Sequence, residues 1–171
     1  IPCKNYTHQT KYTLPIPPSP NLPNMKAVYL YPATCYFEAT PVSLGRGTSL
    51  PFQVYGHPNM TGYDYSFTPK SVPGAKNPPQ LNKLCHGVNL SNMSDEEIWK
   101  RGVDLSYVID AYKNLNIGDH FFRPFFELLV GTDYVRKMII EGKSAEEIKN
   151  RWKGDVEKFK EQRKPYLLYQ E

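Results

Sequence analysis

The segment SAEEIKNRWKGDVEKF, residues 144–159, carries the strongest structural signal in the chain. Ser144 and Glu147 have the spacing of a capping box, in which each side chain binds the backbone N–H of the other residue at the start of a helix. Large apolar side chains then recur every three or four residues, at Ile148, Trp152, Val156 and Phe159. This spacing predicts a long helix with one apolar face, and Pro165 is expected to end it.

Three shorter helices are predicted earlier in the last third, over residues 103–115, 125–130 and 133–141. The first follows from the helical spacing of its apolar residues, and the second is a short helix or a turn. Thr132 is expected to cap the third helix, and Gly142 to stop it. Ser94 with Glu97 is a further capping box, which opens a helix of one or two turns.

Strands are predicted ahead of these helices, over residues 52–55, 66–68 and 84–90. Gly56 is expected to close the first strand, and Gly87 marks a bulge or a close backbone approach in the last. Nearer the start, a helix over 26–31 is expected to end at Pro32, while residues 34–37 fit either a strand or a helix. Strands that precede the helices, rather than alternating with them, favour an α+β fold with a small mixed sheet, long Pro-rich loops and carboxy-terminal helices.

The first residues, 1–25, are predicted to be an ordered Pro-rich segment ahead of the α+β domain of residues 26–171. Five prolines fall between positions 14 and 23. Each proline fixes φ and disfavours helix in the residue before it, so the segment should be stiff and extended. A free linker is the alternative. An ordered path over the domain is favoured by three apolar anchors, Leu14, Ile16 and Leu22.

Composition limits the classes of function. The 171 residues are 40% hydrophobic and 22% charged, as in a globular domain. No run approaches the roughly 18 apolar residues of a membrane span. The net charge of +4 is spread along the chain, so we expect no nucleic-acid partner, although a weak positive field favours an anionic ligand. The 13 tyrosines and 8 phenylalanines fit either exposed carbohydrate-binding aromatics or an aromatic core.

The densest set of chemically useful side chains is FEATPVSLGRGT, residues 37–48. Arg46 stands between Gly45 and Gly47, whose conformational freedom lets the backbone approach a ligand, and its planar guanidinium can bind a carboxylate in a bidentate way. Glu38 is a candidate general acid or base, or a ligand of sugar hydroxyls. Three hydroxyl side chains lie in the same stretch, Thr40, Ser43 and Thr48. The alternative is a structural loop in which Arg46 pairs with Glu38.

Other chemistries have weaker support. The GK[ST] of a phosphate-binding loop is absent, and so is the GxSxG of a nucleophile elbow. Cys85 and His86 are neighbouring metal ligands without a third at suitable spacing, and the three cysteines include no CxxC pair. We therefore expect no metal and no cofactor. His57, between a glycine and a proline, is either a hydrogen-bonding loop residue or a ligand contact.

A series of short motifs resembles one known family. The motifs are PSPN at 18–21, YP at 31–32, FEAT at 37–40, SLGRGT at 43–48, PF at 51–52 and GHP at 56–58. In this order and spacing they resemble the carboxy-terminal half of the exo-β-N-acetylmuramidase (NamZ-type) family, formerly a family of unknown function. The similarity covers nearly the whole chain. Ala39 stands where the family usually has glycine, which adds a methyl group at a tight place.

The resemblance implies part of a longer, exported bacterial hydrolase. Family members carry a Rossmann-like amino-terminal half that we expect to be absent here, and their active-site cleft lies between the two halves. The implied substrate is the terminal N-acetylmuramic acid of peptidoglycan fragments, and the implied location is the periplasm or the cell exterior. The part represented by this chain would contribute one wall of the cleft and be inactive alone. The alternative is a non-catalytic module that binds cell-wall glycans or has a structural role.

The same resemblance assigns roles within the loop. Arg46 would bind the lactyl carboxylate of the sugar, and Glu38 would be the candidate catalytic carboxylate or a binding residue. The remaining site residues would shape the pocket, namely Thr40, Ser43, Gly45, Gly47, Thr48 and His57.

Overall fold

The structure, a computed structural model, describes residues 2–7 and 9–169. Its strands are β1 (Val54–His57), β2 (Tyr65–Phe67) and β3 (Cys85–Asn89), which form one sheet in the order β1-β3-β2. Both strand pairs are antiparallel, so the predicted α+β class is confirmed but the sheet is not mixed. Parallel neighbours need a long crossover that is usually helical, and no helix lies between β1 and β3.

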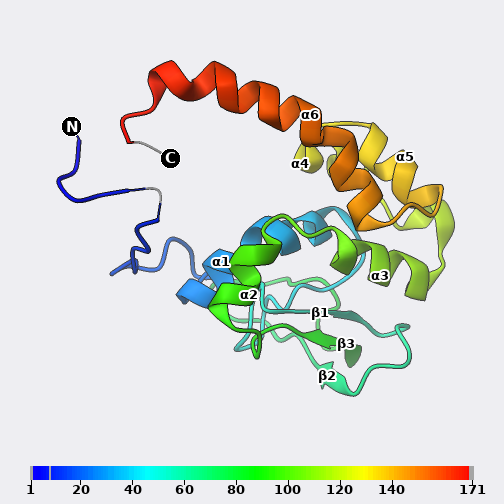
Figure 1. Cartoon of the computed structure of the whole chain (residues 1–171). Coiled ribbons are helices and arrows are strands. Elements are labelled where there is room, and N and C mark those ends of the chain that lie inside the picture. Colours follow the sequence, from blue (N-terminus) through cyan, green and yellow to red (C-terminus); the bar gives the residue numbers. More distant parts are fainter. Residues whose placement is uncertain (1, 8, 170–171) are drawn as a thin grey trace.

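The helices occupy the other side of the molecule. They are α1 (Met25–Thr34), α2 (Asp95–Arg101), α3 (Ser106–Leu115), α4 (Phe125–Val130), α5 (Tyr134–Ile140) and α6 (Ala145–Arg163). Three short 3-10 helices are also present among the described residues, η1 (Cys35–Ala39), η2 (Gly118–His120) and η3 (Lys164–Tyr166). In Figure 1 the helices α1 to α3 lie between the sheet and the group formed by α4, α5 and the start of α6.

Gly56 and Gly87 face each other across β1 and β3. A Cβ on Gly56 would lie 2.6 Å from the backbone oxygen of His86, and one on Gly87 would lie 1.9 Å from that of Tyr55. The close approach predicted at Gly87 is therefore confirmed. The prediction that Gly56 closes its strand is wrong, because this glycine makes room for the neighbouring strand and does not turn the chain.

Helix α1 continues through Pro32, so the predicted end before this residue is wrong. Proline removes one backbone N–H, but the helix around it keeps other hydrogen bonds. The hydroxyl of Thr34 donates to the carbonyl oxygen of Leu30 at 3.0 Å, and the N–H of Cys35 donates to that of Tyr31. The chain then tightens directly into η1, so the segment that fitted strand or helix is helical.

The start of α2 has half of the predicted capping box. The Ser94 side chain accepts a hydrogen bond from the N–H of Glu97 at 3.2 Å. The carboxylate of Glu97 does not return to Ser94 but pairs with Arg101 one turn later, at 3.0 Å. An ion pair at this spacing competes for the carboxylate that the box requires.

Both ends of α5 are defined by the loop residues around it. Asp133, and not Thr132, occupies the N-cap position, so the predicted cap is wrong. The Thr132 hydroxyl is buried and has no hydrogen-bond partner among the residues that the structure describes. At the other end, Gly142 has a φ of +82° and separates α5 from α6, as predicted.

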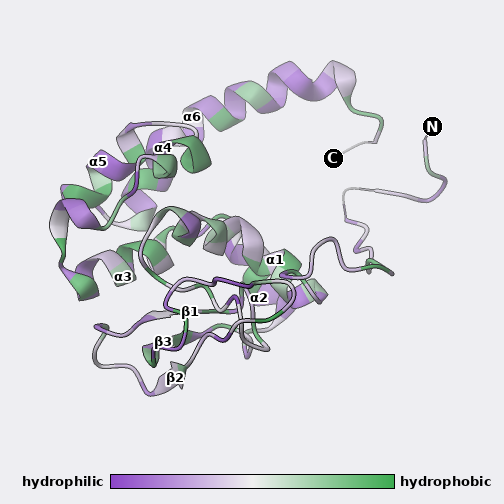
Figure 2. Ribbon diagram, turned by 180° about the vertical axis from the view of Figure 1, so that it is seen from behind, coloured by the Kyte–Doolittle hydropathy of each residue, from purple (hydrophilic) through white to green (hydrophobic). Residues whose placement is uncertain are grey.

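Helix α6 begins with the complete capping box that the sequence predicts. Its apolar face is covered only near this end. Ile148 is fully buried and Trp152 is half-buried, whereas Val156 is 42% exposed and Phe159 is 59% exposed. The helix runs away from the rest of the molecule (Figure 1), and hydrophobic and hydrophilic residues alternate along its projecting part (Figure 2).

The core is built around aromatic residues on the helical side of the sheet. Phe37, Phe52, Phe121 and Phe126 are almost completely buried, and Phe37 stacks on Tyr55 of β1 with ring centroids 4.8 Å apart. Phe121, ahead of α4, and Phe126, within α4, thus both belong to the core. Each such burial stabilises the fold by about 1.5–3 kcal/mol.

The amino-terminal segment lies on the domain only near its end. Leu22 packs against the core, but Leu14 is 38% exposed and Ile16 is 77% exposed, so two of the three predicted anchors are wrong. The segment extends towards the end of α6 (Figure 1). There the N–H of Cys3 donates to the hydroxyl of Tyr169 at 2.6 Å.

Candidate functional site

Glu38 and Arg46 come together at the surface. Glu38 lies on η1, Arg46 lies in the loop between η1 and β1, and the Nη2 of Arg46 donates to Oε1 of Glu38. The side chains are 21% and 33% exposed, so the pair is reachable from solvent while most of each side chain is packed. The Nε of Arg46 is buried without a hydrogen-bond partner in the described part of the chain, so the donors of this guanidinium are not all used there.

Two left-handed glycines hold Arg46 in place. Gly45 has a φ of +79° and Gly47 a φ of +81°, a conformation that glycine adopts without the steric cost of a side chain. A Cβ would lie 2.5 Å from the backbone oxygen of Leu50 at the first position and 2.2 Å from that of Lys70 at the second. The close approaches that both glycines permit are to the chain itself, and they fix the loop that presents Arg46.

Two of the predicted site hydroxyls are buried. The Thr40 hydroxyl donates to the carbonyl oxygen of Phe37 at 2.9 Å and accepts from the N–H of Val42 at 3.2 Å. Ser43 is fully buried, and its backbone exchanges hydrogen bonds of 2.8 and 2.9 Å with Gly56. Thr40 thus ties the loop to η1, and Ser43 ties it to β1. Both contacts help to hold Arg46 in position.

Thr48 closes the loop on its other side and is partly exposed. Its hydroxyl donates to the carbonyl oxygen of Gly45 at 2.7 Å and accepts from the N–H of Leu50 at 3.0 Å. Of the three predicted site hydroxyls, this one lies nearest to solvent. Ala39, where the family usually has glycine, is fully buried in the core, and its φ is not positive. The extra methyl group is thus accommodated by packing without strained backbone.

Two aromatic side chains complete the site and were not predicted as site residues. The guanidinium of Arg46 lies 5.3 Å from the ring centroid of Phe52, within the range of a cation–π interaction. Phe52 is buried with a φ of +59°, which is rare for a bulky residue, and its ring lies 5.1 Å from that of Tyr31. Tyr31 is 39% exposed and offers an aromatic surface beside the pair. The YP and PF motifs were the only sequence signal for these rings.

The electrostatics agree with this grouping. Partial burial raises the pKa of Tyr31, the negative charge of Glu38 raises it further, and Arg46 opposes both effects. Burial, with a contribution from Glu38, raises the pKa of the Cys35 thiol to about 11. Glu38, Arg46, Tyr31, Cys35 and Phe52 therefore share one neighbourhood, which we call the Arg46 site.

His57 lies at the end of β1, opposite His86 in the sheet. Its Nδ1 accepts a hydrogen bond from the N–H of Asn59 at 3.1 Å, which is a loop role. Burial, with a smaller effect of Lys83, lowers the pKa of His57. None of its contacts within the described residues joins it to Glu38 or Arg46, so the structure does not bring His57 into the Arg46 site.

The described residues contain no group of three or more His, Cys, Asp or Glu side chains arranged to hold a metal ion. Cys85 is buried, with its thiol near the carbonyl oxygen of Lys83 at 3.6 Å, whereas the neighbouring His86 is partly exposed. Successive residues of a strand face opposite sides, which separates this pair. Within residues 2–7 and 9–169, no helix has the length and hydropathy of a membrane span.

The structure is thus that of an α+β domain in which a loop held by two glycines presents an arginine–carboxylate pair at the surface. Residues 29–169 match the family described as exo-β-N-acetylmuramidase NamZ, carboxy-terminal. The chain belongs to this family of glycoside hydrolases.

Relatives agree with this assignment. The chain is 34% identical over 167 residues to the peptidoglycan β-N-acetylmuramidase NamZ of Bacillus subtilis (strain 168), covering 89% of this chain and 40% of that protein. A DUF1343 family protein of Bacteroides fragilis NCTC 9343, known from a 1.30 Å crystal structure, is 83% identical with a TM-score of 0.98, covering 100% of this chain and 48% of that one. A second DUF1343 protein of this organism is 20% identical with a TM-score of 0.64, covering 91% and 45%, and supports the fold alone. The chain therefore spans less than half the length of the relatives it matches.

Proposed function

We propose that this chain supplies one wall of the active-site cleft of a glycoside hydrolase that releases terminal N-acetylmuramic acid from peptidoglycan fragments. The observation that carries the proposal is the partly exposed Glu38–Arg46 pair in a chain of the NamZ family. The Bacillus subtilis relative is named as a peptidoglycan β-N-acetylmuramidase, and its name supplies the substrate class.

Arg46 is suited to the feature that distinguishes N-acetylmuramic acid from other amino sugars. That feature is a lactyl carboxylate, and guanidinium groups bind carboxylates through charge-assisted, often bidentate hydrogen bonds. In this proposal the anion meets Arg46 on the face that Glu38 leaves free, and the exposed ring of Tyr31 packs against the sugar. Phe52, beneath the guanidinium, limits its movement.

Glu38 supplies one of the carboxyl groups that glycoside hydrolysis needs. Most glycosidases use two, about 5–10 Å apart, one as acid and the other as base or nucleophile. The second carboxyl group would come from the portion that the longer relatives carry outside the matched region. We therefore propose that the 171-residue chain binds the sugar but does not hydrolyse it, and that the complete enzyme works in the periplasm or outside the cell.

A glycan-binding role without catalysis is the second candidate. It is favoured by the hydrogen bond that ties Glu38 to Arg46, since a carboxylate held in this way positions the guanidinium and need not react. Both candidates use the same Arg46 site, and they differ in whether Glu38 is needed for turnover.

Binding is tested with a matched pair of sugars, N-acetylmuramic acid and N-acetylglucosamine, which differ by the lactyl group. Each is titrated into the ¹⁵N-labelled chain while amide shifts are followed. We expect N-acetylmuramic acid to bind about tenfold more tightly, because one charge-assisted contact stabilises a complex by roughly 1.5 kcal/mol. Arg46→Ala should abolish that preference and Arg46→Lys should reduce it. Equal binding of the two sugars would contradict the role of Arg46.

Arg136→Ala is the matched control, because Arg136 also forms a partly exposed ion pair, with Glu127, at 2.8 Å. It should leave the sugar preference unchanged. Turnover of a chromogenic muramide by a complete enzyme carrying Glu38→Gln separates the two candidates: a loss of turnover with retained sugar binding supports catalysis. Hydrolysis by the 171-residue chain alone would overturn the proposal that it is a single wall.

A further inference from the structure

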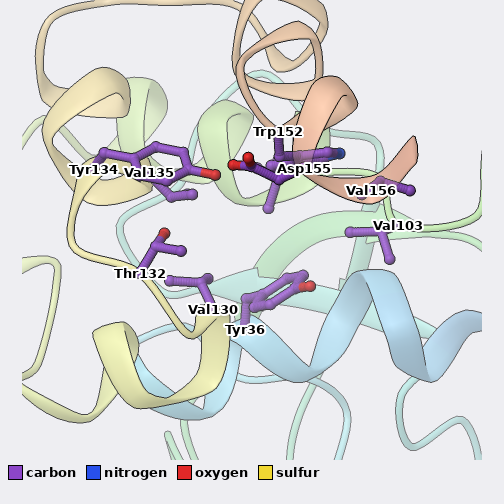
Figure 3. A pocket seen from close by; sticks show the side chains of 10 residues that line it. Tyr36, Val103, Val130, Thr132, Tyr134, Val135, Trp152, Asp155 and Val156 are labelled. Carbon is purple, nitrogen blue, oxygen red and sulfur yellow. The ribbon is translucent and has the colours of Figure 1, made fainter. Parts of the chain in front are cut away.

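A cavity separate from the Arg46 site lies where five segments of the chain meet. Its volume is about 390 Å³, within the range of small-molecule sites. Tyr36 of η1, Val103 and Leu105 ahead of α3, and the region around α5 form its floor and sides, and α6 closes it from above (Figure 3). Because these segments are far apart in sequence, only the folded chain creates this cavity.

Three aromatic rings line it, Tyr36, Tyr134 and Trp152. Aromatic faces attract cations through the negative charge of their π systems. The ring of Tyr134 already contacts a cation, because the guanidinium of Arg151 lies 5.1 Å from the ring centroid. The walls of the cavity are thus chemically suited to a positively charged ligand as well as to an apolar one.

The cavity carries a carboxylate whose side chain is unpaired among the described residues, that of Asp155. Asp155 on α6 takes part in none of the ion pairs or hydrogen bonds among the described residues, although Glu157 and Glu161 on the same helix are both paired with lysines. In Figure 3 the Tyr134 hydroxyl points towards the carboxylate of Asp155, so these two polar groups lie on the same side of the cavity.

We propose that this cavity binds a small molecule in which an apolar body, aromatic or aliphatic, carries a protonated amino group. The ammonium group is the counter-ion of Asp155 and donates to the Tyr134 hydroxyl oxygen. The apolar body lies on Tyr36, Trp152 and the valine side chains between them. A carboxylate can only accept hydrogen bonds, so an anionic ligand is disfavoured at this position. This site uses none of the residues of the Arg46 site and stands independently of the proposed function.

The test uses fluorescence of Trp152. The chain has 2 tryptophans, so Trp99→Phe leaves Trp152 as the sole reporter. The probes are 2-phenylethylamine and its neutral analogue 2-phenylethanol. We expect saturable quenching by the amine and binding at least about tenfold weaker for the alcohol, because the alcohol lacks the charge that meets Asp155.

Asp155→Asn should weaken binding of the amine by about tenfold and leave the alcohol unaffected. Glu157→Gln is the matched control, because this carboxylate lies on the same helix but is paired with Lys160 at 2.9 Å, and binding should not change. Circular dichroism checks that each variant keeps its helices, and both substituted residues are exposed. Equal affinity for amine and alcohol, an unchanged Asp155→Asn variant, or no saturable quenching by either probe would overturn the proposal.

Discussion

Gly56 lies directly opposite Gly87 in the β1–β3 pair, and neither position has room for a Cβ. This close packing also affects the loop that lies next to the sheet. Gly56 also exchanges two backbone hydrogen bonds with Ser43, which begins the loop that carries Arg46. The two glycines thus allow β1 to form backbone hydrogen bonds on both edges, with β3 on one edge and with the Arg46 loop on the other.

Gly87→Ala should destabilise the fold by about 3 kcal/mol, because the added methyl group must push two strands apart. Urea denaturation followed by circular dichroism measures this loss. Gly154→Ala in α6 is the control, since nothing lies within 4 Å of a Cβ at that position. It should raise the free energy of unfolding by up to about 1 kcal/mol through helix propensity alone. If both substitutions had the same effect, the close packing at Gly87 would be wrong.

The two ends of α6 should respond differently to truncation of large side chains. Ile148→Ala should cost roughly 2–5 kcal/mol, because Ile148 is fully buried. Phe159→Ala should change the free energy of unfolding by less than about 0.5 kcal/mol in the 171-residue chain, because Phe159 is 59% exposed. Thermal unfolding of both variants makes the comparison. A large loss from Phe159→Ala would mean that the projecting part of the helix is packed in solution.

Thr40→Val should destabilise the chain by about 1–3 kcal/mol, since it leaves the N–H of the buried Val42 without its partner. The carbonyl oxygen of Phe37 loses the hydroxyl but still accepts from the backbone N–H of residue 40 at 3.0 Å. Thr48→Val should cost less, because its hydroxyl is partly exposed and water can replace it. Chemical denaturation of the two variants is the measurement. The reverse order would show that Thr40 does not brace the Arg46 loop.

The three thiols should differ in reactivity at pH 8. Burial raises the pKa of Cys35 and of Cys85 to about 11, so both stay protonated, whereas Cys3 is exposed. Because the thiolate is the reactive form, iodoacetamide should label Cys3 well before the other two. Peptide mass spectrometry over time follows the labelling, and a sample in denaturant should react at all three. Rapid labelling of Cys35 in the native chain would contradict its placement beside Glu38.

Much of the local structure could be predicted because it depends on neighbouring residues. The capping box of α6, the helical spacing of apolar residues and the close approach at Gly87 are signals of this kind. The Pro-rich segment shows the limit of such reasoning. Proline correctly indicated a segment without a helix, but the chain bends at residues 15–16 and turns between Ser19 and Leu22, so it is not extended throughout. Apolar character alone did not make Ile16 an anchor, because burial requires a partner surface.

The order of residues in the chain by itself determined the α+β class, the capping box of α6 and the candidate pair Glu38 and Arg46, since these depend on residues near one another in sequence or on the order of the predicted elements. Only the tertiary structure decided which groups share a site. It buried the hydroxyls of Thr40 and Ser43, and it brought Tyr31 and Phe52 to the guanidinium. It also left Asp155 facing an aromatic cavity. The physical reason is that contacts between distant segments depend on how whole elements pack, and no local pattern encodes that packing.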